Sequence, residues 1–454
     1  MNLPIEFTNK IQNILGEESD RFFSHLQDES PIGIRTNPIK INRHDFLAVV
    51  AAKESSIPWC RDGFFLHEEK SRVTKHPYYH AGLCYVQEPS AMIPAEALQV
   101  EPGQWVLDLC AAPGGKTTQI AGKLANSGLL IANDVSPKRL APLIQKVQAF
   151  GITNTFVTHE APERLATVFT GQFDRVLVDA PCSGEGMFSR NPRSIQQWSP
   201  DYVNECARLQ REILVDAIKM LAPGGILVYS TCTFSPEENE GTIQWILDHY
   251  PYMVVDPLIE FPELSPSDPT WIQGDKSLSG ARRAWPHRIK GYGHFIARLK
   301  DQRPVQKQPR QLQGEIAPPE LFQIWQEENL QTHLTGIFHQ KKDKLYLCPK
   351  ELPFAAKTGL RSPSPGLYLG EMKKNRFQPS QALAMSLSKS QVKRTVDFEV
   401  TKPESLKYLR GDTIMQGSPN KGWTLITIDD HPVGWAKQTG DHLKNQIPAG
   451  WKYD

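Results

Sequence analysis

Short apolar runs alternate with longer amphipathic segments along the middle of the chain. The apolar runs predict buried strands, and the amphipathic segments, whose apolar positions recur every three or four residues, predict helices. The expected strands span residues 105–108, 129–134, 155–158, 175–179 and 226–231, and a later, antiparallel strand is expected within 291–299. The expected helices span residues 114–124, 137–150, 200–221 and 236–250. This alternation predicts a mostly parallel sheet with helices on both faces, which is an α/β fold.

The pattern changes on either side of this region. Residues 33–41 alternate like a strand among short helical segments, whereas residues 301–318 are rich in Gln, Pro, Arg and Lys and predict a linker. Near the C-terminus, residues 396–400 and 423–428 alternate like strands, and a hairpin is expected after Asp429-Asp430. We therefore expect an N-terminal α+β lobe at residues 1–100, the α/β domain at 101–300, the linker at 301–318, an α/β module at 319–390 and a β-rich module at 391–454.

The charge is unevenly distributed, although the net charge of the 454 residues is only +1. Residues 1–300 hold 29 Lys and Arg against 34 Asp and Glu, whereas residues 301–454 hold 22 against 16. A basic C-terminal third is typical of an appendage that binds a polyanion. A chance bias among solvated surface charges explains the same numbers equally well.

The cysteines and the N-terminal residues indicate in which cellular compartment the protein is expected. Seven scattered cysteines, an odd number, argue against a disulfide framework and for a reducing, cytoplasmic setting. No Cys-x-x-Cys pair or His/Cys cluster predicts a metal site. The first residues lack a basic stretch followed by an apolar core, and no run of roughly 18 apolar residues occurs, so neither a signal peptide nor a membrane helix is expected.

A glycine-rich turn at residues 108–118 joins the first expected strand to a helix and predicts a nucleotide-type pocket. A phosphate-binding P-loop is one interpretation, but Cys110 stands where its first glycine belongs and Pro113 lacks the N–H that a phosphate cradle needs. An S-adenosylmethionine site is the other interpretation. Asp134, at the end of the second strand, can accept both ribose hydroxyl groups, or it can simply cap the next helix.

Two cysteines follow two of the expected strands. Cys182 comes just after Asp179, and Cys232 follows the strand at 226–231. If these strands are neighbours, about 5 Å apart, both thiols can face one substrate. A lone cysteine is usually an inert buried residue, but two at matched strand ends beside a carboxylate favour chemistry.

Three long motifs now carry a resemblance to a known family. They are DLCAAPGGKTT (residues 108–118), DAPCSGEGM (179–187) and YSTCTFSPEEN (229–239). With them the chain resembles, from about residue 33 to 299, the Sun-domain (NSUN) RNA methyltransferases, which form 5-methylcytosine. The stretch GLYLGEMKKNRF (366–377) further resembles the bacterial RsmF (YebU-like) branch, which methylates 16S ribosomal RNA.

The resemblance implies a fold, a cofactor and partners. The fold would be a Rossmann-like class I methyltransferase that uses S-adenosylmethionine. The N-terminal lobe would be RRM-like, and the C-terminal β-rich region would be PUA-like and bind RNA. We expect a cytoplasmic monomer that acts on 16S rRNA or the small ribosomal subunit, with no metal and no membrane partner.

The resemblance also assigns roles to residues. It makes Cys232 the nucleophile that attacks carbon 6 of cytosine, and it makes Cys182 the residue that assists elimination of the product. DNA cytosine methyltransferases attack instead from a Pro-Cys cysteine, so Cys232 favours RNA. Asp179 and Lys116 would hold the cytosine edge. The implied cofactor residues are Cys110, Ala111, Ala112, Pro113, Gly114, Gly115, Lys116, Asp134, Arg139, Glu160 and Asp179.

Two alternatives stay open at this point. The chain could be an RNA-binding ribosome assembly factor with a vestigial site, or its substrate could be tRNA rather than rRNA. Basic side chains of the C-terminal region are candidates for phosphate contacts. They are Lys341, Lys342, Lys344, Lys373, Lys374, Arg376, Lys393 and Arg394.

Overall fold

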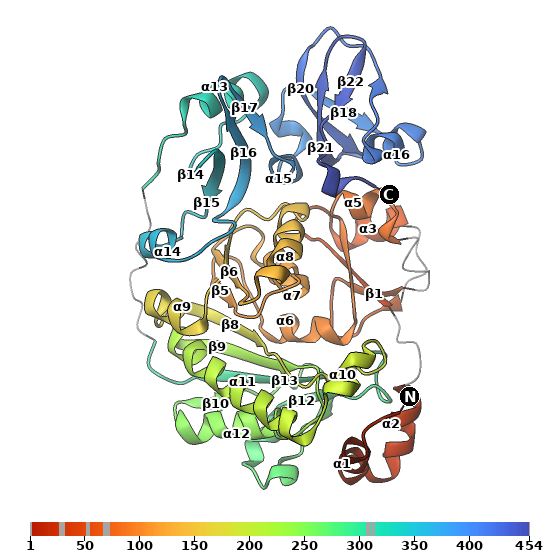
Figure 1. Cartoon of the computed structure of the whole chain (residues 1–454), viewed down its shortest axis with the longest axis vertical. Coiled ribbons are helices and arrows are strands. Elements are labelled where there is room, and N and C mark those ends of the chain that lie inside the picture. The colour runs from red at the N-terminus through yellow and green to blue at the C-terminus, as the bar shows by residue number, and fades with distance from the viewer. Residues whose placement is uncertain are drawn as a thin grey trace.

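A large central sheet organises the molecule, and three smaller sheets surround it (Figure 1). The computed structural model describes residues 2–26, 32–50, 55–66, 73–305, 310 and 314–453. Within these residues, one antiparallel sheet precedes the central sheet in the chain and two sheets follow it, and the two C-terminal sheets lie at the top in Figure 1.

The central sheet has the strand order β11-β12-β13-β9-β8-β5-β6-β7, with β10 paired to β13. Its parallel strands are β5 (Trp105–Asp108), β6 (Leu129–Asn133), β7 (Thr155–Thr158), β8 (Phe173–Asp179) and β9 (Leu221–Thr231). Its antiparallel strands are β10 (Met253–Val255), β11 (Ser265–Pro266), β12 (Arg282–Ala284) and β13 (His294–Asp301). The parallel α/β fold and the late antiparallel strand are thus confirmed. The strand order reverses between β5 and β8, and ligands of such sheets bind beyond the strand ends at this point.

Helices cover both faces of this sheet because successive strand residues point to opposite sides. On one face, α9 (Pro162–Phe169), α11 (Pro200–Met220) and α12 (Glu240–His249) pack into one apolar core with Leu107 and Ile131. On the other face, α6 (Ile93–Ala97), α7 (Gly115–Leu124) and α8 (Pro137–Ala149) pack into a second core with Val106 and Leu130.

Two elements of the central domain begin four or more residues away from the expected position, β9 and α12. Strand β9 begins at Leu221 rather than at residue 226. The pairing of β8 with β9 shifts its register between Phe173 and Arg175, so the Pro-Gly-Gly segment at residues 223–225 remains within the strand as an irregularity. Helix α12 begins at Glu240 rather than 236. The residues before it are held instead by side-chain hydrogen bonds, as when Glu238 accepts a bond of 3.0 Å from the backbone N–H of Ser183.

The N-terminal region contributes an antiparallel sheet and several short helices. The sheet has the order β2-β3-β1-β4, formed by β1 (Ile32–Thr36), β2 (Ser55–Ser56), β3 (Gly63–Leu66) and β4 (Cys84–Gln87). Its helices include α3 (Arg43–Val50) and α5 (Pro77–His80). Two further helices, α1 (Ile5–Leu15) and α2 (Ser19–His25), pack with Phe7 and Phe22 against Phe188 and Phe234 of the central domain.

Two C-terminal sheets complete the fold. The first has the order β14-β15-β16-β17, with β14 (Ile337–Lys341), β15 (Lys344–Cys348), β16 (Leu367–Lys373) and β17 (Arg376–Pro379). The second has the order β18-β20-β21-β22-β19, with β18 (Thr395–Phe398), β19 (Ile414–Met415), β20 (Gly422–Ile428), β21 (His431–Gln438) and β22 (His442–Asn445). Asp429 and Asp430, with φ of 47° and 67°, form the β20–β21 turn, so the expected hairpin is confirmed.

The modules share apolar cores. Ile34 and Phe64 of the N-terminal sheet pack in one cluster with Phe398 and Ile426 of the last sheet. Across the same junction, the Tyr78 hydroxyl donates a hydrogen bond of 2.6 Å to a carboxylate oxygen of Asp429. Part of the predicted linker, residues 306–309 and 311–313, lies outside the described residues.

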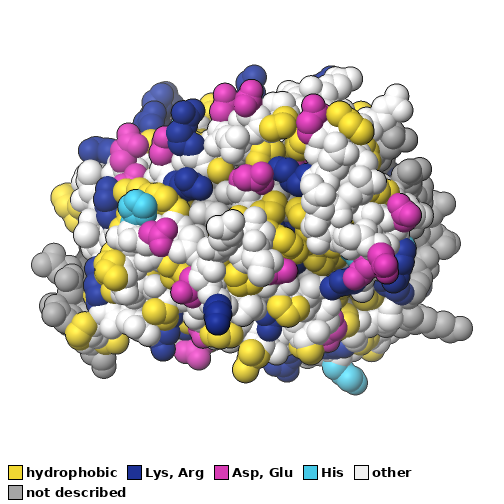
Figure 2. Space-filling model, turned by 90° about the horizontal axis from the view of Figure 1, so that it is seen from below, with side chains coloured by type: hydrophobic (Ala, Val, Ile, Leu, Met, Phe, Trp, Pro, Cys, Tyr) yellow, Lys and Arg dark blue, Asp and Glu magenta, His cyan; other side chains and the backbone are white. Residues whose placement is uncertain are grey.

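The surface in Figure 2 is the end opposite the two C-terminal sheets. Basic and acidic side chains are interspersed over it, so neither sign of charge dominates this face. In the described residues, none of the helices combines the length and the apolar character that crossing a membrane requires.

Candidate active site

The two cysteines meet at the carboxyl ends of adjacent parallel strands. Cys182 follows β8 and Cys232 follows β9, and these strands pair with Asp179 opposite Ser230. The two sulfur atoms lie 3.4 Å apart, and neither cysteine forms a disulfide. The hydrogen bond with Cys232 and burial raise the pKa of the Cys182 thiol well above its usual range. Cys182 is therefore protonated at neutral pH.

A buried ion pair stands beside the thiols. The Lys116 ammonium lies 2.7 Å from one carboxylate oxygen of Asp179, and the Ser230 hydroxyl donates a bond of 2.7 Å to the other. Burial alone would raise the pKa of Asp179, but Lys116 and His294 hold it well below its usual range. Burial would likewise lower the pKa of Lys116, yet the negative charge of Asp179 and the hydrogen bond to it raise that pKa. Both groups of the pair are therefore charged at neutral pH.

Two buried glutamates, Glu185 and Glu238, connect the loop after β8, which carries Cys182, to the loop after β9, which carries Cys232. We call these the cysteine loops. From the sequence, neither glutamate was predicted as a site residue. Glu238 accepts bonds from the Ser183 backbone N–H (3.0 Å), from the Ser183 hydroxyl and from the Gln210 amide (2.8 Å). Glu185 accepts bonds from the Phe234 N–H (2.7 Å), the Ser235 hydroxyl and the Trp198 indole. Glu238, after β9, thus holds the loop after β8, and Glu185, after β8, holds the loop after β9. The sequence did contain a sign of their importance, because Glu185 and Glu238 both belong to the motifs that carry the family resemblance.

Burial and the neighbouring Glu185 raise the pKa of Glu238 to about 7. A backbone contact completes the link between the loops, since the Gly186 N–H donates a bond of 2.9 Å to the Cys232 carbonyl oxygen. The position of the Cys232 thiol therefore depends on both loops.

The glycine-rich turn borders a cavity of about 220 Å³, which we call the site cavity. Arg35 braces this turn from the N-terminal sheet, since its guanidinium donates to the Gly115 carbonyl oxygen (3.1 Å) and to the Thr118 hydroxyl (2.8 Å). The cavity is lined by Tyr85, Val86, Gln87, Glu88, Ala91, Cys110, Ala111, Ala112, Pro113, Gly115, Lys116 and Asp179. The N-terminal contribution from β4 and the segment after it was not expected as part of the site.

The remaining cofactor candidates do not line this cavity. Asp134 accepts bonds from the backbone N–H groups of Ala112 (3.2 Å) and Ser136 (2.9 Å), and Arg139 lies 3.5 Å from its carboxylate. Asp134 and Arg139 therefore lie beside the turn and hold its backbone. Gly114, with φ of 106°, begins the helix from the left-handed region.

Glu160 is occupied by a residue of the C-terminal region. Its carboxylate accepts bonds from the Arg361 backbone N–H (2.7 Å) and from the Arg361 guanidinium (2.9 and 3.2 Å). The chain near Arg361 also lies along the edge of β7, because Val157 donates to the Ser364 carbonyl oxygen at 3.0 Å. The C-terminal region thus covers the open edge of the central sheet beside the turn.

The basic candidates divide into two groups. Most lie in the β14–β15 and β16–β17 hairpins, where Lys341 pairs with Lys344 and Lys373 with Arg376. Arg394 differs, because its guanidinium donates to the Trp423 carbonyl oxygen and the Asn329 side chain. Arg394 therefore has a structural role. Among the described residues, no three His, Cys, Asp or Glu side chains gather as a metal site.

Sequence comparisons place the chain among known methyltransferases. Residues 95–300 match the family described as 16S rRNA methyltransferase RsmB/F. The other matches are the N-terminal domain of 16S rRNA methyltransferase RsmF (3–89), the RsmF rRNA methyltransferase first C-terminal domain (325–387) and the methyltransferase RsmF PUA domain (395–453).

Individual relatives agree with these matches. Ribosomal RNA small subunit methyltransferase F of Cronobacter sakazakii is 31% identical, with 98% of this chain and 95% of that protein covered. The protein of the same name from Escherichia coli is 32% identical, with 94% and 92% covered.

Solved structures agree as well. A methyltransferase homolog protein from Pyrococcus horikoshii shares 33% identity with a TM-score of 0.59, covering 65% of this chain and 94% of that one. The structure of NSun6 from Pyrococcus horikoshii with SFG has a TM-score of 0.57 at 24% identity, covers 66% of this chain and 99% of that one, and supports the fold. The expected Rossmann-like methyltransferase fold with a C-terminal PUA domain is therefore confirmed, and the chain belongs to the RsmF family of ribosomal RNA small subunit methyltransferases.

Proposed function

We propose that this protein methylates carbon 5 of a cytosine in 16S rRNA, with S-adenosylmethionine as methyl donor. The observation that carries the proposal is the pair Cys182 and Cys232, with sulfur atoms 3.4 Å apart, beside the ion pair of Lys116 and Asp179. A vestigial site in an assembly factor would have no reason to keep both thiols and the charged pair in one place. The names of the relatives, all small-subunit rRNA methyltransferases, support 16S rRNA over tRNA.

The proposed chemistry begins at Cys232, because carbon 5 of cytosine is a poor nucleophile. The thiolate of Cys232 forms a bond to carbon 6, and the ring then behaves like an enamine whose carbon 5 can take the methyl group. Afterwards a base takes the proton from carbon 5, the electron pair of that bond restores the double bond between carbons 5 and 6, and the sulfur of Cys232 leaves carbon 6 as a thiolate. We assign assistance in this elimination to Cys182.

Asp179 and Lys116 are proposed to hold the edge of the base. An ionised carboxylate accepts hydrogen bonds, which suits the amino group of cytosine, and an ammonium donates them, which suits a ring carbonyl oxygen. The low pKa of Asp179 keeps it an acceptor across the physiological range.

The turn fits the proposed cofactor. Asp108 is buried, one of its carboxylate oxygens has no hydrogen-bond partner among the residues that the structure describes, and burial raises its pKa to about 7. Burial raises the pKa of the Cys110 thiol, and the carboxylates of Asp108, Asp179 and Asp134 around it raise it further. Such a negative surrounding suits the positive sulfonium of S-adenosylmethionine. When bound, the cofactor supplies the methyl group; the residues from Cys110 to Lys116, with Asp134, Arg139 and Glu160, would hold it.

The target base has to leave its stack, because a thiol cannot reach the ring face of a stacked cytosine. Unstacking costs a few kcal/mol, which contacts to the rest of the RNA must offset. We propose that the β14–β15 and β16–β17 hairpins, with Lys341, Lys344, Lys373 and Arg376, contact phosphates. We also propose that the N-terminal lobe is RRM-like and that the chain is divided into the five regions expected from the sequence. The protein is further proposed to be a monomer in the cytoplasm.

Methyl transfer to purified RNA tests the function. The protein is incubated with labelled S-adenosylmethionine and either 16S rRNA, 30S particles or bulk tRNA, and the RNA is digested to nucleosides. We expect label in 5-methylcytosine from 16S rRNA or 30S particles. Label only in tRNA, or none in cytosine, would refute the proposal.

A further inference from the structure

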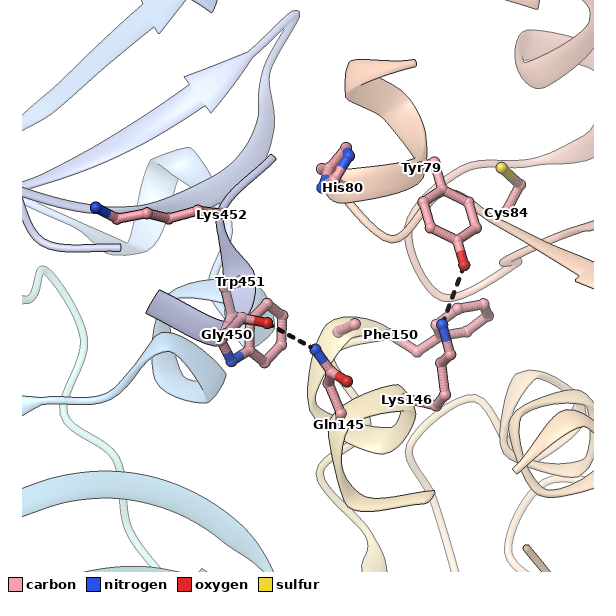
Figure 3. Close-up of a pocket in the computed structure, with 10 residues that line it drawn as sticks. Tyr79, His80, Cys84, Gln145, Lys146, Phe150, Gly450, Trp451 and Lys452 are labelled. Carbon is pink, nitrogen blue, oxygen red and sulfur yellow. Dashed lines mark hydrogen bonds between the residues drawn. The ribbon is translucent and has the colours of Figure 1, made fainter. Parts of the chain in front are cut away.

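A second cavity of about 220 Å³ lies where the N-terminal lobe, α8 and the last residues of the chain meet (Figure 3). We call it the junction cavity. Figure 3 shows Trp451 on one side, Tyr79 and Lys146 on the other, and Gln145 between them. Pockets for drug-sized ligands measure about 300–1,000 Å³, so this cavity suits a single ring system with its polar substituents.

The walls combine aromatic rings with hydrogen-bonding groups. The Lys146 ammonium donates a bond of 3.1 Å to the Tyr79 hydroxyl oxygen and lies 5.2 Å from the centre of that ring. The hydroxyl hydrogen of Tyr79 is thus left to donate to a ligand. Trp451, half-buried, adds a second large aromatic face, and the exposed Gln145 amide is held by the Gly450 carbonyl oxygen at 3.1 Å.

His80 adds an acceptor. Burial lowers the pKa of this histidine, so it is neutral at pH 7, and its ring bonds to the backbone of Thr74. Its Nε2 is buried and makes no hydrogen bond to the described residues. Because a neutral imidazole that donates through one nitrogen accepts through the other, Nε2 is an acceptor. The cavity wall therefore carries a donor and a cation beside aromatic rings, and His80 adds an acceptor whose Nε2 is buried, which together suit a nucleotide.

The junction cavity adjoins the site cavity. The two lie on either side of β4, because Cys84 lines the junction cavity and the next residue, Tyr85, lines the site cavity. Lys146 connects them, since its ammonium lies 5.2 Å from the Tyr79 ring and 5.5 Å from the Tyr85 ring. A cation between two neighbouring cavities is placed to meet a phosphate that joins two nucleotides.

We propose that the junction cavity holds one nucleotide of the RNA substrate while the target cytosine lies at the end of the site cavity where Lys116 and Asp179 line it. Its base stacks on Trp451, its polar edge meets the Tyr79 hydroxyl, and its phosphate lies near Lys146. The inference rests on the proposed function for the identity of the substrate. It makes the end of the chain, which lies in the PUA domain, part of the substrate site.

Equilibrium binding to a 16S rRNA transcript tests this proposal separately from catalysis. Stacking of one base on an aromatic side chain is worth a factor of about ten or more in affinity. We therefore expect Trp451→Ala and Tyr79→Ala to raise the Kd about tenfold. Trp451→Phe, which keeps a stacking face, should stay within about twofold of wild type. Phe354→Ala removes an exposed aromatic ring elsewhere and serves as the matched control.

A measurement on the unaltered protein guards against unfolded variants. Photocrosslinking to a transcript that carries 4-thiouridine should label peptides that contain Tyr79 or Trp451. Wild-type Kd in a folded Trp451→Ala variant, or crosslinks that avoid both peptides, would overturn the inference. So would binding of free CMP or AMP in the cavity that 16S rRNA does not displace. Absence of methyl transfer by a wild type that binds RNA would instead count against the proposed function alone.

Discussion

The sulfur atoms of Cys182 and Cys232 lie 3.4 Å apart although fifty positions separate the residues in the chain. Their contact follows from the pairing of β8 with β9, which end at the same edge of the sheet. Each thiol then sits in a loop that a buried glutamate fastens to its surroundings.

The ion pair of Lys116 and Asp179 is expected to support both stability and turnover. Lys116→Met leaves Asp179 without its cation and should cost about 2 kcal/mol in the free energy of unfolding. It should also lower kcat by about 100-fold or more, if Lys116 contacts the reacting base. Urea unfolding and single-turnover methyl transfer provide the measurements.

The matched control is the double variant Lys116→Met/Asp179→Asn, which removes both charges. It should recover part of the lost stability but none of the activity. Equal additive losses in stability would show that the two groups do not interact.

Gly186 is expected to tolerate no side chain. A Cβ there would lie 2.9 Å from the Cys232 carbonyl oxygen and 3.1 Å from that of Tyr292, both backbone atoms. Gly186→Ala should shift the Cys232 loop, cost about 1–3 kcal/mol and reduce kcat with little change in the KM for S-adenosylmethionine. Gly314→Ala, where a Cβ meets nothing within 4 Å, is the control. An unchanged kcat in Gly186→Ala would show that the loop can move without consequence.

Glu238 is expected to make stability depend on pH. Its pKa is about 7 in the folded protein, because of burial and Glu185, against about 4.3 in an unfolded chain. The folded state therefore binds more protons between these values, so stability falls as pH rises from about 4.3 to 7, by on the order of 3 kcal/mol from this group. Glu238→Gln should flatten the profile of unfolding free energy between pH 5 and 7. Asp108, whose pKa is also about 7, contributes in the same direction and should leave a residual slope.

Asp134 is expected to affect the cofactor and not the RNA. It lies beside the turn, where it accepts the Ala112 N–H, and it is proposed to hold the cofactor ribose. Asp134→Ala should weaken S-adenosylmethionine binding about tenfold or more in calorimetry while the Kd for 16S rRNA stays unchanged. The exposed Asp441→Ala provides the control. A wild-type cofactor affinity in Asp134→Ala would remove Asp134 from the proposed site.

The central sheet was predictable because its strands are short apolar runs that end in polar residues, as β5 does at Asp108. The adjacency of Cys182 and Cys232 could be anticipated from the same pattern, since parallel neighbours end together. Contacts between distant segments could not, because nothing in local periodicity encodes them. Arg361 meets Glu160 across 201 positions, and Tyr85 reaches the site cavity from the N-terminal sheet. Glu238 belongs to a quoted motif, but its role was missed because the helix expected over residues 236–250 covers the segment that the structure uses to hold the Cys182 loop.

The most direct test of the account is a covalent trap on a denaturing gel. Wild type, Cys182→Ala and Cys232→Ala are each incubated with labelled 16S rRNA and S-adenosylmethionine, and protein bound to RNA is read as a slow band. Because Cys232 forms the bond to carbon 6 and Cys182 assists its release, the account predicts a strong band with Cys182→Ala and none with Cys232→Ala. A band with Cys232→Ala and none with Cys182→Ala would contradict it and reverse the two roles.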